Sequence, residues 1–435
     1  MNPLAEELNV TLREASPELF GALSRLGREL FFPRGILTQT AEARERAGKY
    51  NATIGIARQD GEAMHLPAMM KHIKGLSPDE TVDYAPSYGN MRLRKAWLAD
   101  MLAKNPSLAG RKTSLPVVTS GITHGLTVAG EMFLDPGDLV VMPDKAWGNY
   151  NMIYGVRREA GIRRFKLFDG GSFNTAAMAE ALGKALDDKG KALLLLNFPN
   201  NPTGYSIRRD EADGIVEAVL AAAGPGRDVI VVLDDAYFGL FYTEDALTES
   251  LFGRFAGASK HVFPVKLDGA TKEEYAWGLR VGFVTFSVAA QGREDEVHTA
   301  LEKKVGGTVR GNISNCSQLS QSLVLSVLED PAYAAQKEEK FEEMKHRATR
   351  VLEVLANPAY AEVWEPYPFN AGYFMSIALK GIDAEQFRLR LLDSYGVGVI
   401  AEGSSDIRIA FSCLEVDEIA DLFDIMYRCA GEMKE

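Results

Sequence analysis

Cysteine is scarce in this chain. Cys316, Cys413 and Cys429 are its three cysteines among 435 residues, and none of them forms a CxxC pair. An odd number of widely separated cysteines argues against a disulfide framework and against a zinc site. The six histidines are equally scattered. We therefore expect reduced thiols and no metal site.

Long apolar runs and basic stretches are also absent. No apolar run approaches the roughly 20 residues that span a bilayer, and the start Met1–Glu7 lacks the basic and apolar regions of a signal peptide. The net charge of −12, with no basic stripe, argues against nucleic acid as a partner. No GxxxxGK[ST] phosphate loop is present. The sequence predicts a cytoplasmic protein that binds neither membrane nor nucleic acid.

The chain has enough apolar residues, 46% of the total, to build two hydrophobic cores. Short apolar runs alternate with amphipathic stretches such as 175–186 and 210–223, which indicates a mostly parallel sheet between helices. Residues 331–355 have a helical pattern that we expect to link a large domain to a smaller one containing strands near 372–378 and 407–411. The apolar runs of the expected sheet begin at Pro116, Leu139, Ala192, Val229 and Val281.

Polar or aromatic side chains follow three of these apolar runs. Asn201 lies in the turn 197–204, Asp234 and Tyr237 follow the run 229–233, and Trp147 follows the run 139–142. Ligands of open α/β sheets bind at the carboxyl ends of the strands. We therefore expect these side chains to converge on one ligand, although plain turns and a core tryptophan are the alternatives.

Lys272 is the most informative residue. It ends the segment Gly269-Ala270-Thr271-Lys272, and Arg280 follows eight residues later between Gly278 and Gly282. A neutral lysine amine attacks carbonyl carbons to form an imine, and the planar guanidinium of arginine suits a phosphate. The spacing suits the lysine of a pyridoxal phosphate site. A solvated turn that enters a strand is the alternative for this segment.

Together these segments resemble the aspartate aminotransferase superfamily, the class I and II pyridoxal phosphate enzymes of fold type I, and most closely its aspartate and aromatic branch. The resemblance extends from about Asn51 to Arg408. It implies an α/β fold whose large domain, residues 71–325, holds a mostly parallel seven-stranded sheet between helices. Residues 1–70 and 326–435 would then form a smaller α/β domain.

The resemblance also assigns the residues that hold the cofactor ring. Lys272 matches the lysine that forms the imine and then moves the Cα proton as a general base and acid. Asp234 matches the carboxylate on the pyridine nitrogen, Tyr237 and Asn201 match the pair on the phenolic oxygen, and Trp147 matches the aromatic that stacks on the ring. Lys272, Asp234 and Tyr237 are thus the expected catalytic residues.

The expected phosphate site combines one arginine with the start of a helix. Arg280 matches the phosphate arginine, Thr271 precedes the lysine, and Gly121-Ile122-Thr123 opens a helix after a strand, where backbone amides favour a phosphate. Tyr84 matches a tyrosine that reaches the phosphate of the neighbouring subunit. The resemblance therefore implies a homodimer with shared active sites.

The substrate residues are also implied by the resemblance. Arg408 matches the arginine that binds the substrate α-carboxylate, a task for a bidentate guanidinium. Gly55 lies in a segment expected to pass over the substrate, and Trp147 and Asn201 are also expected to contact the substrate. Arg310 matches an arginine delivered across the dimer to a distal carboxylate. An aminotransferase that uses aspartate or glutamate with 2-oxoglutarate, by ping-pong kinetics, is the resulting prediction.

Three departures from the family pattern limit this prediction. Gly269 stands where many members have a phosphate-binding serine, Ala57 replaces an aromatic, and residues 311–313 after Arg310 differ from the usual sequence. An aromatic aminotransferase, a lyase or decarboxylase on the same scaffold, and a ligand-sensing domain are the alternatives. The GxGxxA stretch at 396–401 leads into no helix, so it does not indicate a dinucleotide site.

Overall fold

A seven-stranded sheet forms the centre of the computed structural model, which describes residues 2–31 and 35–434. β12 is antiparallel to both of its neighbours, and the other strand pairs are parallel. The expected mostly parallel seven-stranded α/β sheet is confirmed. In spatial order its strands are β4 (Val117–Thr119), β12 (Gly282–Phe286), β11 (Val262–Gly269), β10 (Asp228–Asp234), β9 (Lys191–Asn197), β5 (Leu139–Pro143) and β6 (Gly161–Phe165).

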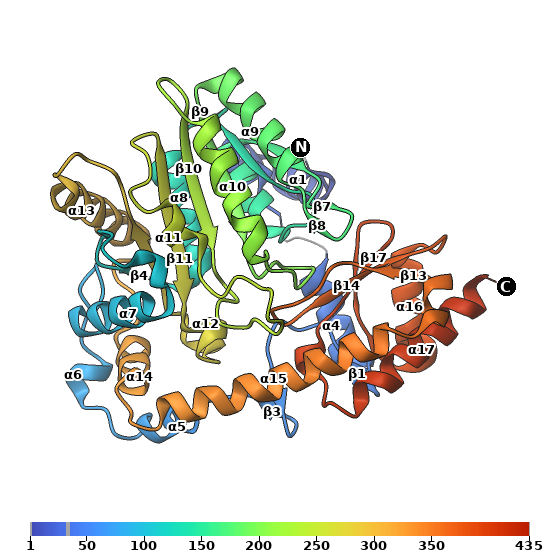
Figure 1. The fold of residues 1–435 in the computed structure, drawn as a ribbon. Coiled ribbons are helices and arrows are strands. Elements are labelled where there is room, and N and C mark those ends of the chain that lie inside the picture. The colour runs from blue at the N-terminus through green and yellow to red at the C-terminus, as the bar shows by residue number, and fades with distance from the viewer. Residues whose placement is uncertain (1, 32–34, 435) are drawn as a thin grey trace.

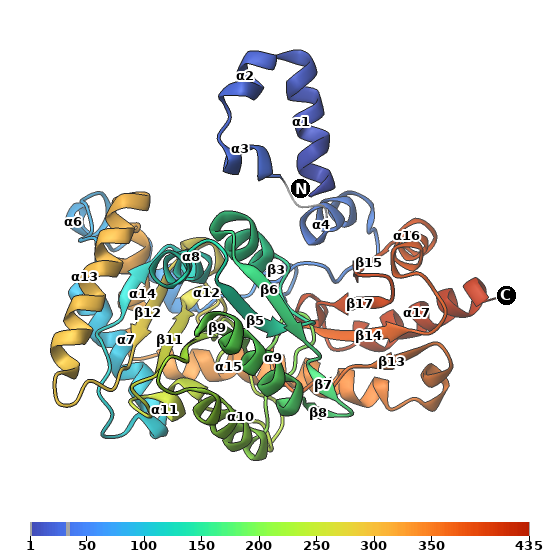
Figure 2. The same cartoon turned by 90° about the horizontal axis from the view of Figure 1, so that it is seen from above.

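Both faces of this sheet are covered by helices (Figures 1 and 2). Alternate residues of a strand point to opposite faces, so a strand buried on both faces is a continuous apolar run. In β9, Leu193 and Leu195 belong to the core shared with α8 (Gly121–Phe133). Leu194 and Leu196 belong to the core shared with α9 (Thr175–Lys189) and α10 (Arg209–Ala222).

A second, four-stranded sheet is fully antiparallel. Helices α16 (Ala384–Tyr395) and α17 (Glu418–Lys434) lie beside it, and α15 (Tyr333–Leu355) runs from the large sheet toward it (Figure 1). The strands expected near 372–378 and 407–411 are present, while the domain boundaries at 71 and 325 stay a prediction. The sheet consists of β13 (Trp364–Pro366), β14 (Met375–Leu379), β17 (Asp406–Ile409) and β16 (Ile400–Glu402).

Two strands of the large sheet were not recognised in the sequence. β11 contains the buried charged residues Lys266 and Asp268, which interrupt its apolar pattern. β6 is an edge strand with two arginines, Arg163 and Arg164. A central strand that carries charges and an exposed edge strand both lack the apolar run on which the prediction relied.

The first helices stand apart from the rest of the molecule (Figure 2). α1 (Pro3–Ala15), α2 (Pro17–Ala22) and α3 (Arg25–Glu29) pack against one another, and the guanidinium carbons of Arg13 and Arg28 lie 4.8 and 4.7 Å from the centre of the Phe20 ring. α4 (Ile36–Arg46) lies against β15 (Val397–Gly398) and β16. The sequence offered no motif for the first forty or so residues, and their assignment, as part of residues 1–70, to the smaller domain stays a prediction.

The remaining elements are short or lie at the surface. Within the described residues, no helix is both long and apolar enough to cross a membrane, and Cys316, Cys413 and Cys429 are free thiols. These elements are β1 (Tyr50–Asn51), β2 (Arg58–Gln59), β3 (Glu62–Ala63), β7 (Phe168–Asp169), β8 (Ser172–Phe173), α5 (Pro67–His72), α6 (Pro78–Thr81), α7 (Met91–Lys104), α11 (Leu251–Phe255), α12 (Ala270–Glu273), α13 (Glu294–Ile313), α14 (Gln318–Leu328), a π-helical turn (Asn151–Val156) and 3₁₀ turns (Pro106–Leu108, Trp277–Leu279, Pro358–Glu362, Phe411–Cys413).

Candidate active site

One cavity of about 190 Å³ collects most of the residues predicted from the sequence. It lies beyond the carboxyl ends of β9 and β10, the edge at which α/β sheets bind ligands. Strand ends that are far apart in the sequence meet there because the parallel strands share one direction. The predicted residues that line it are Gly55, Ile122, Thr123, Trp147, Asn201, Asp234, Tyr237, Lys272 and Arg408.

Lys272 lies on α12, the single helical turn that follows β11. Its Nζ is 4.8 Å from the centre of the Tyr237 ring, and within the described residues no carboxylate forms an ion pair with it. Burial lowers the pKa of Lys272 to about 8, with Asp234 opposing and Arg280 assisting this shift. A large share of the amine is therefore neutral near pH 8, which is the form that attacks a carbonyl.

Asp234 is the last residue of β10 and is buried. Its Oδ2 accepts a hydrogen bond of 2.6 Å from the hydroxyl of Tyr150, and its Oδ1 accepts one of 3.2 Å from the backbone N–H of Ala236. Burial raises the pKa of Asp234, while the Tyr150 hydrogen bond and Lys272 act in the opposite direction. This carboxylate is thus placed to hold a positively charged group in the cavity.

Arg408 lies on β17 with its guanidinium buried. Nη1 donates to Asn201 Oδ1 at 3.1 Å, Nη2 donates to the backbone oxygen of Thr53 at 3.0 Å, and Nε has no partner among the described residues. Its Cζ lies 4.2 Å from the centre of the Phe374 ring. A buried guanidinium with spare donors and no ion-pair partner in the described chain suits a ligand carboxylate.

The phosphate candidates surround the start of α8. Gly121 has φ +75°, and a Cβ there would lie 2.4 Å from Nη2 of Arg280, so the close approach of the arginine requires glycine. The side chain of Ser120 does not cap the helix. Thr271 Oγ1 is buried and has no hydrogen-bond partner among the described residues. Arg280 donates to the backbone oxygen of Trp277 at 3.3 Å. Free amides, a free hydroxyl and a guanidinium fit the phosphate of pyridoxal phosphate.

The backbone also explains the glycine at position 269. A Cβ on Gly269 would lie 2.6 Å from the backbone oxygen of Val281 and 2.7 Å from Cα of Gly282. A serine would therefore collide with backbone atoms, which cannot move aside as a flexible side chain can. The missing serine hydroxyl is a consequence of the close pairing between β11 and β12.

Tyr84 and Arg310 do not line the cavity. Tyr84 is 84% exposed, and Arg310 is exposed at the end of α13, where it donates to Ser314 Oγ at 2.7 Å. Ser87 Oγ donates to the backbone oxygen of Ser314 at 3.0 Å, so the two segments adjoin on one surface. Both residues are predicted to act on a neighbouring subunit, and their roles stay predictions.

Several cavity residues were not predicted from the sequence. Tyr150 carries the hydrogen bond to Asp234, and its position three residues after Trp147 was the available signal. Asn197 joins two strand ends, since its Nδ2 donates to the backbone oxygen of Asp234 at 2.8 Å and its Oδ1 accepts from the N–H of Asn201 at 2.9 Å. Ile36, Ala236 and Phe374 complete the lining, and no motif marked them.

Comparisons with known proteins find similar aminotransferases. A probable N-acetyl-LL-diaminopimelate aminotransferase of Bacillus subtilis is 25% identical over 356 residues, which are 79% of this chain and 81% of that protein. The aspartate aminotransferase of Escherichia coli is 23% identical over 385 residues, 85% of this chain and 91% of the relative.

The solved structures show the same fold. An aminotransferase of Anaerococcus prevotii matches with a TM-score of 0.82 at 22% identity, covering 94% of this chain and 98% of that one. The kynurenine aminotransferase of Pyrococcus horikoshii, solved with PMP, matches with a TM-score of 0.77 at 17% identity, covering 96% and 99%. The sequence model for "Aminotransferase class I and II" matches residues 48–425. The chain therefore belongs to the class I and II aminotransferase family, the fold type I enzymes that use pyridoxal phosphate.

Proposed function

We propose that this aminotransferase moves the amino group of aspartate or glutamate to a 2-oxo acid such as 2-oxoglutarate. One observation carries the proposed amino transfer: the guanidinium of Arg408 and the amine of Lys272, neither with an ion-pair partner among the described residues, line the same cavity. The first group suits a carboxylate, and the second suits a proton transfer beside it. The name of the E. coli relative, aspartate aminotransferase, supports the choice of substrate.

The cofactor would be held along one wall of the cavity. Arg280, Thr271 and the amides of residues 121–123 would hold its phosphate, Asp234 its pyridine nitrogen, and Tyr237 with Asn201 its phenolic oxygen. No hydrogen bond engages the Tyr237 hydroxyl within the described part of the chain, so this donor is free for a ligand. When bound, pyridoxal phosphate supplies an electron sink for the electrons released at the substrate Cα.

The protein's own residues would then orient the substrate and move its proton. Arg408 binds the α-carboxylate, while Trp147 and Phe374 confine the reacting carbon between apolar surfaces. The neutral amine of Lys272 takes the Cα proton, which a charged ammonium cannot do. With the cofactor bound, the negative charge of Asp234 would favour a proton on the pyridine nitrogen. The proposal predicts ping-pong kinetics, in which the first product leaves before the second substrate binds.

A homodimer would complete the site. The surface near Tyr84 and Arg310 exposes large apolar side chains, with Val82 84%, Met91 50%, Ile313 42% and Leu319 39% exposed. Apolar side chains gathered on one surface indicate a protein interface. A second copy on this surface would bring Tyr84 and Arg310 to the neighbouring cavity. The two-domain division and the cytoplasmic location remain predictions from the sequence.

Family membership favours transamination over the lyase and sensing alternatives. A lyase would release ammonia or carbon dioxide from the amino acid, and neither is a product of amino transfer. An aromatic substrate stays the alternative to aspartate, because Trp147, Tyr150 and Phe374 line the cavity with rings.

The test is the change in visible absorbance when aspartate, glutamate, alanine or phenylalanine is added to the cofactor-loaded enzyme. Aspartate and glutamate should change the visible absorbance of the cofactor most readily. Arg310→Ala should weaken these two by about 10- to 100-fold, the effect of one lost charged hydrogen bond, and leave alanine and phenylalanine nearly unchanged. Arg293→Ala, which changes an exposed arginine at the other end of α13, is the control. Equal losses for all four amino acids would refute the role of Arg310.

A further inference from the structure

A second cavity, of about 620 Å³, lies beside the cavity of about 190 Å³ that Lys272 lines. Ile36 and Trp147 line both cavities, so these two side chains stand at the boundary between them. The start of α4, residues between 144 and 156 and the turn from β16 to β17 contribute most of the remaining lining. The larger space can hold a substrate side chain that is longer than those of aspartate and glutamate.

The charged side chains of this second cavity are mostly acidic. Asp144, Glu402 and Asp406 line it. Lys145 is the one basic residue among the described residues of the lining. Three carboxyl groups against one ammonium leave negative charge in excess, which favours a positively charged ligand over an anion.

Two of the three carboxylates already have partners within the protein. Asp406 forms an ion pair with Lys145 and accepts a hydrogen bond of 3.0 Å from the Tyr367 hydroxyl. Asp144 Oδ1 accepts hydrogen bonds of 2.9 Å from the backbone N–H groups of Lys145 and Leu167. These two carboxylates therefore hold the wall of the cavity together.

Glu402 differs from both, because its side chain forms no ion pair and no hydrogen bond within the described part of the chain. It ends β16 and lies directly opposite Asp406 of β17, and opposite residues of antiparallel strands point to the same face. Burial raises the pKa of Glu402, while Arg408 and Lys145 act against this shift and Asp406 adds to it. The carboxyl group thus lies within electrostatic reach of Arg408 in the first cavity and of Lys145 in the second.

The two cavities together can hold one elongated amino acid. With its α-carboxylate on Arg408 and its Cα near Lys272, the side chain can pass Ile36 and Trp147 into the larger space. Apolar surfaces suit the methylene groups of a long side chain whose charge lies at its end. A positive charge at that end would meet Glu402, the carboxyl group that has no partner of its own.

We propose that Glu402 binds the distal cation of a basic amino acid, which with its 2-oxo acid forms a second substrate pair of this aminotransferase. The basic amino acid loses its α-amino group and becomes a 2-oxo acid, while 2-oxoglutarate gains that group and becomes glutamate. The distal cation takes no part in the exchange and serves only for recognition. This inference rests on the proposed function, in which Arg408 binds the α-carboxylate and Lys272 moves the Cα proton.

The first test is the calorimetric binding of 5-guanidinopentanoate and 5-ureidopentanoate to the cofactor-loaded enzyme. Both offer a carboxylate to Arg408, and neither has an α-amino group, so no amino transfer occurs. They have nearly the same shape, but only the first carries a positive charge. The wild type should bind the guanidinium compound about 10- to 100-fold more tightly, the effect of a charged hydrogen bond. Glu402→Gln should bind the two compounds about equally.

The second test is the rate at which arginine, citrulline and glutamate change the visible absorbance of the cofactor. Citrulline is the neutral counterpart of arginine, so it reports every contact except the one with the charge. Glu402→Gln should slow arginine by about 10- to 100-fold, and the loss should be confined to arginine.

Glu365→Gln is the matched control. Glu365 lies on β13 of the same sheet, is exposed, and is not among the described residues that line either cavity. This variant should keep the wild-type preference for arginine over citrulline.

Two results would overturn the inference: a wild type that treats arginine and citrulline alike, or a Glu402→Gln variant that loses both equally. The first comparison needs no variant, so a failure of Glu402→Gln to fold leaves the inference testable. Glutamate that changes the absorbance while arginine does not would refute the basic substrate alone. Arginine that reacts while aspartate and glutamate do not would refute the dicarboxylate substrate alone.

Discussion

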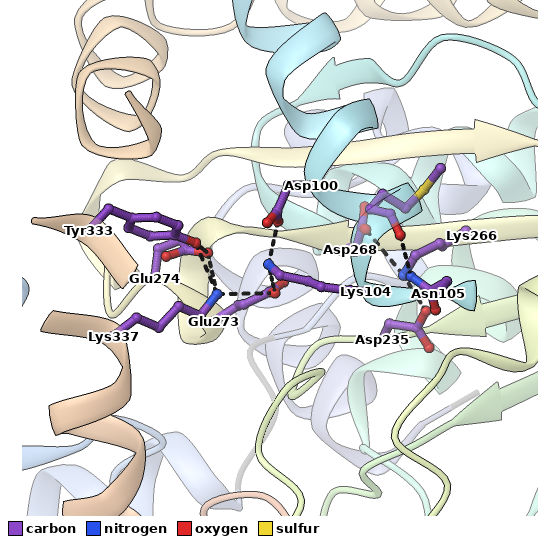
Figure 3. A network of polar contacts seen from close by, with 11 residues as sticks. Asp100, Lys104, Asn105, Asp235, Lys266, Asp268, Glu273, Glu274, Tyr333 and Lys337 are labelled. Carbon is purple, nitrogen blue, oxygen red and sulfur yellow. Dashed lines mark hydrogen bonds and ion pairs between the residues drawn. The ribbon is translucent and has the colours of Figure 1, made fainter. Parts of the chain in front are cut away.

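Two sets of buried charges differ in how they are paired: those of the cavity around Lys272, and the cluster of Asp100, Lys104, Glu273, Glu274 and Lys337 (Figure 3). In the cavity, Lys272 and Arg408 have no ion-pair partner among the described residues. In the cluster around Glu273 and Glu274, each ammonium of Lys104 and Lys337 contacts two carboxylates. Buried charges are normally paired, so the unpaired set indicates a ligand and the paired set indicates a structural support.

Lys266 and Lys272 show the same difference within six residues. Lys266, 1% exposed on β11, lies 2.5 Å from Asp235 and 3.1 Å from Asp268. Burial disfavours its charge, but these two carboxylates raise the pKa of Lys266 above its ordinary value. Burial without such partners lowers the pKa of Lys272 to about 8. Pairing, more than burial, thus accounts for the opposite pKa shifts of the two lysines.

The largest expected effect follows from removing the unpaired lysine. Lys272→Ala should lower turnover by at least about 10²- to 10⁴-fold, the usual contribution of a general base, and should abolish the visible band of the lysine-bound cofactor. Steady-state kinetics and an absorbance spectrum check this prediction. A variant that keeps the band intact would show that another lysine carries the cofactor.

Removing one partner from the paired set should affect stability. Glu273→Gln should lower the free energy of unfolding by about 3 to 5 kcal/mol, because it leaves buried ammonium groups underpaired. Denaturant unfolding at neutral pH measures this value. A loss below about 1 kcal/mol, the range of exposed pairs, would contradict the structural role.

Glu273 should also affect how the free energy of unfolding depends on pH under acidic conditions. Its folded-state pKa, about 2, lies below the ordinary value of 4.5 for a glutamate. The stability it contributes is therefore present above about pH 4.5 and is lost as the pH falls toward about 2. Unfolding measured across this window should show a shallower pH dependence for Glu273→Gln than for the wild type. Identical slopes would mean that Glu273 is not held charged by its lysines.

A smaller effect is expected at the carboxylate-binding end of the cavity. Arg408→Lys keeps the charge but loses the planar fork, so kcat/KM should fall about 10- to 100-fold. The kcat/KM values for phenylalanine and aspartate should fall to a similar extent, because both substrates carry an α-carboxylate. A loss confined to aspartate would instead place Arg408 at the distal carboxylate.

The smallest effect is expected for an exposed pair. Glu353→Gln breaks the 3.0 Å contact with Arg350 on the surface of α15, and both side chains are more than 40% exposed. Solvent screens such pairs, so the free energy of unfolding should change by less than about 0.5 kcal/mol. A loss of unfolding free energy as large as that for Glu273→Gln would contradict the distinction between buried and exposed ion pairs.

The sequence was sufficient to predict the residues placed by strand ends. Asn201 follows β9 and Asp234 ends β10, so the topology of one sheet brings these two residues together. Lys272 follows β11, which was not recognised, and was predicted from its spacing to Arg280. Tyr150 and Phe374 depend on side-chain packing between distant segments, which no local pattern records. Lys266 in β11 is paired with Asp235 outside the strand and with Asp268 within it, and the sequence pattern does not show this pairing. The charged residues of β11 therefore prevented its recognition as a central strand.

Two further pairs of residues have a place or role that the sequence pattern does not reveal, for different reasons. Lys104 and Lys337 are 233 residues apart, and no spacing rule connects them to the Lys272 turn. Tyr84 and Arg310 are exposed and do not line the cavity of their own chain, so their predicted roles depend on a second subunit. Family resemblance supplied these two residues, and the packing of one chain does not test them.

The central claim is that the unpaired lysine, and not its paired neighbour, carries the cofactor. Borohydride reduction of the cofactor-loaded protein fixes the cofactor to that lysine, and peptide mass spectrometry then identifies the residue. We predict the added mass on the peptide position of Lys272, with Lys266 unmodified. Modification of Lys266, or of a lysine outside the cavity, would contradict the account.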